Sequence, residues 1–175
     1  MASGLLLLRL VLGLTVAGHG AQKLWPVLGG YGLKGTAGFF GSMGFRSPVA
    51  MAFLAGLSEF GGGTLFAAGL LTPFAALALT VVMLIAIVSV HWAKGFWSTA
   101  GGYEYNLLIL AGAVAVAATG PGRFSLDHAF GWDDNLCGFR WGAGVVVVGA
   151  VIAFLVLTLG RKAAAPAAPA EPTAS

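Results

Sequence analysis

Charged residues are scarce in this chain of 175 residues: Asp, Glu, Lys and Arg together make up 9% of it, against roughly 25% in a typical soluble domain. Hydrophobic residues make up 58%, which leaves too few polar side chains to cover a water-exposed surface. A helix that crosses a bilayer uses about 20 residues, so the chain has room for roughly five spans. The composition therefore predicts one all-α integral membrane domain embedded in the lipid bilayer.

Cysteine and clustered basic residues are also lacking. Cys137 is the only cysteine, so one chain can form neither an internal disulfide nor a CxxC dithiol pair. The formal charge is only +3, and the basic residues are scattered between apolar runs, which argues against nucleic acid as a partner. The histidines and the single cysteine lack the spacing of a closed zinc site, so no metal site is predicted.

Apolar runs dominate what remains, and they cover residues 4–24, 48–71, 73–92, 103–119 and 141–160. Nothing basic precedes Arg9, so we interpret the first run as a retained helix and not as a signal peptide. The tight break at Thr72-Pro73 predicts a helical hairpin between the second and third runs. Residues 28–47 are rich in glycine and predict a loop with a short interfacial turn around 36–43.

These runs predict a four-helix transmembrane bundle with a fifth transmembrane helix near the C-terminus. The expected division is a four-helix core over 1–122, a polar extramembrane or interfacial loop over 123–140, the fifth span over 141–160 and a disordered tail over 161–175. Most Lys and Arg residues fall on the side of the tail. The positive-inside rule then places the N-terminus outside and the C-terminus in the cytoplasm.

Polar residues inside the spans converge in one half of the bilayer. Titratable side chains at this depth are costly, and they usually face the bundle interior. At 100° per residue, one stripe of the first helix carries Arg9, Thr15, His19, Gln22 and Lys23. Glu59 lies on a face of small residues in the second helix, which favours close approach of a neighbouring helix. The hairpins gather a candidate ligand or proton site with these members: His19, Gln22, Lys23, Glu59, His91, Tyr103 and Glu104, with Arg9 secondary.

The same residues also allow a purely structural interpretation. Glu59 would then pair with Lys23 or His19 only to neutralise a buried charge, and Glu104 would stabilise a helix N-terminus. Haem ligation by His19 and His91 is possible in a bundle but is disfavoured here. No catalytic role is assigned to any of them.

Seven motifs, in order, resemble the DoxX family of bacterial membrane proteins. They are LLRLVLGLTVAGHGAQKL at 7–24, GTAGFFGSMGF at 35–45, LAGLSEFGGG at 54–63, GLLTP at 69–73, HWAKGFW at 91–97, and GGYEYNLLIL with GPGRFSLD up to residue 127. The resemblance implies a four-helix membrane core in the bacterial cytoplasmic membrane. It also implies a redox association, since relatives include the DoxD-type membrane subunit of thiosulfate:quinone oxidoreductase. The family's polar positions fall on the residues of the candidate site.

Three functions remain open at this point. In the first, the protein is a membrane subunit associated with an oxidoreductase: Lys23 or His19 donates to a quinone oxygen, and Glu59 or Glu104 relays the proton. The chain has no recognisable electron carrier, so this hypothesis requires a soluble redox partner. In the second, it is a non-catalytic membrane anchor or assembly factor. In the third, it is a small transporter, although no inverted repeat is evident.

Overall fold

The computed structural model describes residues 2–162, and the predicted tail 161–175 therefore lies, from residue 163 onward, outside the described part of the chain. Within that part the fold is helical, as predicted, and contains no β-strand. Its α-helices are α1 (Ala2–Leu24), α2 (Gly32–Ser42), α3 (Pro48–Ala68), α4 (Thr72–Ala86), α5 (Glu104–Thr119), α6 (Leu126–Ala129) and α7 (Phe139–Leu159).

Four helical segments are long and apolar enough to cross a membrane: Ala2–Leu24, Pro48–Ala68, Thr72–Lys94 and Phe139–Leu159. The third of these is α4 together with its continuation, a π-helical segment Ile87–His91 and a 3-10 turn Trp92–Lys94. α5 is apolar too but has 16 residues, which at 1.5 Å per residue gives a length of about 24 Å. The multi-pass membrane architecture is confirmed. α5 is shorter than each of the four spanning segments.

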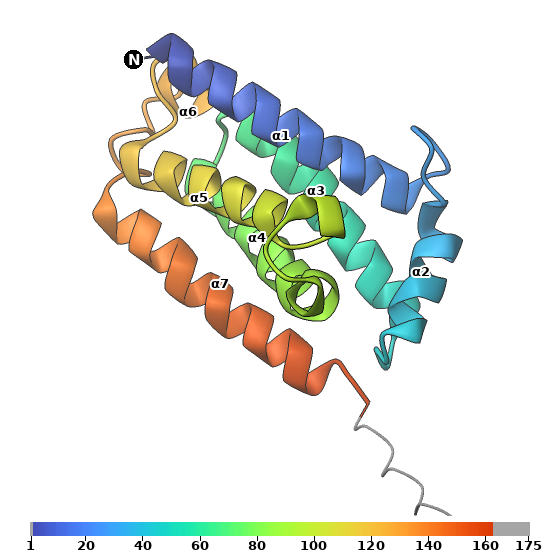
Figure 1. The fold of residues 1–175 in the computed structure, drawn as a ribbon. Helices are drawn as coiled ribbons and strands as arrows, with labels where there is room; N and C mark the ends of the chain where they lie inside the picture. Colours follow the sequence, from blue (N-terminus) through green and yellow to red (C-terminus); the bar gives the residue numbers. More distant parts are fainter. Residues whose placement is uncertain (1, 163–175) are drawn as a thin grey trace, which may run out of the picture.

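The long helices form one bundle in which consecutive helices run in opposite directions (Figure 1). α1 packs along α3, and α4 packs against α3, α5 and α7. α7 runs along the edge of the bundle that is opposite α1 (Figure 1). α2 lies across the ends of α1 and α3 and contacts both. The buried core is built mainly from aliphatic side chains of α4 and α5, with Val16 from α1 and Phe66 from α3.

Small residues let α1 and α3 approach closely. A Cβ atom on Gly20 would lie 2.2 Å from the backbone nitrogen of Phe60, and one on Gly63 would lie 2.6 Å from that of Ala17. Neither position has room for a side chain. The sequence predicted a closely packed neighbour on the small-residue face around Glu59. Gly63 beside that face meets α1, whereas Gly62 within it meets Ala78 and Leu79 of α4. The contact at Gly63 brings the end of α1 beside the middle of α3.

Residues 123–140 contain more structure than the predicted polar loop. Ser125 caps α6, because its hydroxyl accepts a hydrogen bond of 3.1 Å from the His128 backbone N–H. His128 Nδ1 in turn lies 2.7 Å from Asp133 Oδ2, and this hydrogen bond lowers the pKa of the Asp133 carboxyl below its ordinary value. The segment is therefore organised by its own polar contacts between α5 and α7.

Candidate functional site

An ion pair between Lys23 and Glu59 joins α1 to α3. Lys23 lies in the last turn of α1 and donates to Glu59 Oε2. Glu59 is 3% exposed, whereas the Lys23 side chain is about one-quarter exposed. A carboxylate buried among apolar helices requires a partner of opposite charge. The pairing that the sequence allowed for Glu59 is thus present, with Lys23 as the partner and not His19.

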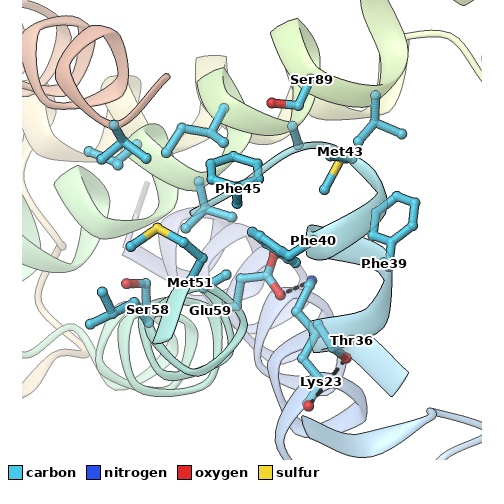
Figure 2. A pocket seen from close by; sticks show the side chains of 18 of the residues that line it. Lys23, Thr36, Phe39, Phe40, Met43, Phe45, Met51, Ser58, Glu59 and Ser89 are labelled. Atoms are coloured by element: carbon cyan, nitrogen blue, oxygen red, sulfur yellow. Dashed lines mark hydrogen bonds and ion pairs between the residues drawn. The ribbon is translucent and has the colours of Figure 1, made fainter. Parts of the chain in front are cut away.

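The ion pair forms part of the wall of a cavity of ≈ 620 Å³. This cavity lies between α2, α3, α4 and α7, and apolar and aromatic side chains make up most of its surface (Figure 2). The polar residues in its wall are few: Lys23, Tyr31, Thr36, Ser58, Glu59, Ser89 and His91. A mostly apolar cavity of this size with a few convergent polar groups is typical of a small-molecule site.

α2 forms one wall of the cavity through Phe39 and Phe40. Its position is fixed from α1: the Thr36 hydroxyl donates to the Lys23 carbonyl oxygen at 3.3 Å, and Gln22 Nε2 donates to the Leu28 carbonyl oxygen at 2.7 Å. The predicted interfacial turn at 36–43 is therefore part of a full helix over a ligand-sized space. No sequence pattern predicts the cavity, because only packing decides whether a glycine-rich segment covers one.

His91 is the third predicted site residue in the cavity wall. Its Nδ1 donates to the Gly101 carbonyl oxygen at 2.6 Å, which fixes the ring orientation and leaves Nε2 free of this bond. His91 ends the π-helical segment of α4. The structure therefore brings together Lys23, Glu59 and His91 around one space.

The other predicted residues lie around the cavity and do not line it. His19 is exposed, and its Nδ1 lies 3.2 Å from Gln22 Oε1. Tyr103 stacks on Trp92 with ring centroids 5.5 Å apart, and Glu104 accepts a 2.9 Å hydrogen bond from the Ser98 backbone N–H. These contacts organise the α1–α2 and α4–α5 connections. Their contribution to a ligand site would be indirect.

Arg9 belongs to a separate buried network at the opposite end of the bundle. Its guanidinium donates to the Phe124 carbonyl oxygen. Nearby, the fully buried Asp127 carboxylate accepts from the Leu71 and Thr72 backbone N–H groups at 2.7 and 2.9 Å and from the Thr72 hydroxyl at 2.6 Å. Asp127 therefore caps α4 from a distant segment.

Gly69 makes this network possible. Its φ of +64° is a left-handed conformation, and a Cβ atom there would lie 1.5 Å from Arg9 Nη1. Asp127, which the sequence placed in a polar loop, is thus a structural acid. Within residues 2–162, no group of three His, Cys, Asp or Glu side chains is placed so that it could hold a metal ion.

Comparison with known proteins identifies the family of this chain. The family model described as DoxX matches residues 4–92, just over half of the chain. The chain belongs to the DoxX family. The matched range of this DoxX protein contains Lys23, Glu59 and His91, and it excludes α5 and α7.

Two relatives agree with this assignment. The "Uncharacterized membrane protein Rv3486" of Mycobacterium tuberculosis is 32% identical over 143 residues, which cover 76% of the DoxX chain and 85% of the relative. The "Putative oxidoreductase CatD" of Bacillus subtilis is 32% identical over 124 residues, which cover 71% and 84%. No solved structure matches significantly.

Proposed function

We propose that this DoxX protein is a membrane subunit associated with an oxidoreductase and that it binds a quinone headgroup in the cavity beside Lys23 and Glu59. The observation that carries the proposal is the position of a buried ion pair in the wall of an apolar cavity of ≈ 620 Å³. An ion pair that only joined two helices would need no such space next to it. The name of the Bacillus subtilis relative supports the redox association.

The residues present fit a quinone in both size and chemistry. The aromatic and aliphatic wall from α2, α3 and α7 suits the ring and the beginning of an apolar tail. A bound quinone would accept two electrons and two protons, and the electrons would come from a soluble redox partner. Lys23 would donate a hydrogen bond to one ring oxygen, and Glu59 would hold and transfer a proton beside it.

The first test is the quinone content of the purified protein. Wild type, Glu59→Gln and His19→Ala would be purified in mild detergent and extracted with solvent, and quinone would be quantified by absorbance before and after adding it back. We expect about one quinone per wild-type chain and at least a tenfold loss of affinity in Glu59→Gln, because a hydrogen bond that involves a charged group contributes about 1.5–3 kcal/mol.

His19→Ala is the matched control, since His19 does not line the cavity, and it should bind like wild type. A wild-type protein that contains no quinone and takes none up would overturn the proposal. In that case Glu59→Gln would only lower the melting temperature, and the ion pair would serve a membrane anchor or assembly factor.

We further propose that α5 crosses the membrane as well, which gives five spans in the bacterial cytoplasmic membrane. α4 ends at the same end of the bundle as α2, whereas α7 begins near α6 at the other end (Figure 1). The chain between them must therefore cross, and α5 carries no charge after Glu104. The division into a core over 1–122, an extramembrane segment over 123–140 and a fifth span over 141–160 belongs to the same proposal.

The orientation rests on basic residues that remain after the buried ones are set aside. Lys23 is ion-paired and Arg9 is buried in a network. Five basic residues then lie at the end of the bundle that holds α2: Lys34, Arg46, Lys94, Arg161 and Lys162. Arg123 and Arg140 lie at the other end. By the positive-inside rule, this asymmetry supports an N-terminus outside and a C-terminal end of α7 in the cytoplasm.

The single cysteine reports this orientation directly. Cys137 lies between α6 and α7, at the end of the bundle that should face outside. A membrane-impermeant maleimide added to intact cells should label the wild type and leave Cys137→Ser unlabelled. Lys94→Cys in the Cys137→Ser background should react only after the membrane is permeabilised. The reverse pattern would mean that the N-terminus faces the cytoplasm.

A further inference from the structure

One side chain in the cavity wall has a hydrogen-bonding group without a partner. The Ser89 hydroxyl oxygen is buried and, among the described residues, finds no hydrogen-bond partner. Ser89 lies in the π-helical segment Ile87–His91 and lines the cavity. Figure 2 shows it on the helical segment that continues α4, on a different wall from the Lys23–Glu59 pair.

Several hydroxyl groups elsewhere in the apolar helices donate to a carbonyl oxygen of their own helix. Four threonines donate to the carbonyl oxygen four residues earlier, at 2.6 to 2.8 Å: Thr15, Thr64, Thr119 and Thr158. This is the usual contact of Ser and Thr in a helix interior. Ser89 does not make this contact. It lies where the helix that continues α4 changes from α to π geometry, and such π-helical turns are frequent at functional sites.

Thr80 is the informative comparison. Its hydroxyl is also buried and without a partner in the described part of the chain, but Thr80 does not line the cavity. A missing partner alone therefore does not mark a site. What distinguishes Ser89 is the combination of an unused hydroxyl, a π-helical turn and a place in the wall of a ligand-sized space.

We propose that Ser89 is the second polar contact of the ligand, opposite Lys23. This inference rests on the proposed function and makes the ligand class more specific. A ligand held at both walls carries two hydrogen-bond acceptors at opposite ends of a ring, as a 1,4-quinone does. An amphiphile with a single polar group would engage the Lys23–Glu59 pair and leave Ser89 unused. The hydrogen of the Ser89 hydroxyl rotates about the C–O bond, so the hydroxyl can donate to a ligand oxygen.

Two probes and two matched variants test this with the full-length chain in detergent. The probes are a 1,4-benzoquinone with a decyl tail and decyl phenyl ketone, which has one carbonyl group. Isothermal titration calorimetry would compare wild type, Ser89→Ala and Thr80→Ala. We expect Ser89→Ala to weaken quinone binding by about tenfold, the effect of losing one good hydrogen bond, and to leave binding of the ketone unchanged. Thr80→Ala should change neither affinity.

Stability serves as the internal check. Ser89→Ala removes a hydroxyl that has no partner, so its melting temperature should equal or exceed that of wild type. Ser89→Thr keeps the hydroxyl and should recover most of the quinone affinity. Equal quinone affinity in wild type and Ser89→Ala would overturn the role of Ser89, as would an equal loss for both probes. A wild type that binds neither probe would instead overturn the proposed function.

Discussion

Replacing Lys23 by methionine is expected to destabilise the protein by about 3–5 kcal/mol, because Glu59 would remain as a buried charge without its partner. Glu59 is 3% exposed and lies in the middle of α3, so bulk solvent reaches its carboxylate poorly once the ammonium group is lost. The loss should appear in the free energy of unfolding at neutral pH, measured in detergent by circular dichroism. No other single change at the cavity should cost as much stability.

The double variant Lys23→Met/Glu59→Gln is the control for this prediction. It removes both charges, so it should recover most of the lost stability, since a buried ion pair often contributes little compared with neutral residues of similar size. If it folds but binds no quinone, the pair has a ligand-binding role that is separate from its structural role. If Lys23→Met is as stable as wild type, Glu59 has another partner or stays neutral, and the ion pair does not hold α1 to α3.

The sequence predicted that Lys23 and His19 lie near Glu59, because this requires only the helix lengths and the chain reversals, and it left open which of the two pairs with Glu59. The apolar runs fix where each helix ends, and hairpins bring the end of the first run beside the second. The small residues around Glu59 predict close packing of a neighbouring helix, and the structure shows α1 packed closely there at Gly20 and Gly63, which have no space for a Cβ atom. This part of the site follows from periodicity and from the cost of burying charge.

The remaining features depend on packing that one sequence does not reveal. Asp127 stands in a polar segment, where a buried cap and a solvated acid have the same local pattern. Its burial follows from the turn at Gly69 and Leu71, whose φ values are positive. The π-helical turn around Ser89 has no signature either, since the run 73–92 contains no glycine and no proline after Pro73 that would mark a change in helix geometry. The cavity exists only because α2 folds back over α3 and α7 closes the space from the other side.

α7 connects the cavity to a part of the chain outside the DoxX family match at 4–92. Ile152 and Val156 of α7 line the cavity. The end of α7 is held to the α2–α3 connection by two backbone hydrogen bonds of 2.9 Å, from Arg46 N–H to the Gly160 carbonyl and from Lys162 N–H to the Gly44 carbonyl. α7 is therefore a fixed wall of the cavity.

Replacing Ile152 by tryptophan should abolish quinone binding while Lys23, Glu59 and Ser89 all remain. Ile152 lines the cavity and is 36% exposed overall, so an indole ring there has open space to enter, and the fold should tolerate it better than overpacking in a closed core. We expect a loss of affinity of at least about a hundredfold, because the ring and the ligand cannot occupy the same space. Calorimetry with the decyl benzoquinone would measure it.

Val147→Trp is the matched control, since Val147 lies on the same helix, is 62% exposed and does not line the cavity. It should bind quinone like wild type, and Ile152→Leu, which conserves volume, should do nearly the same. Loss of binding in Ile152→Trp alone, with an unchanged melting temperature, would place the ligand between α7 and the Lys23–Glu59 pair. Wild-type affinity in Ile152→Trp would mean that any quinone binds elsewhere on the bundle, and Lys23 and Glu59 would then be left with their structural role.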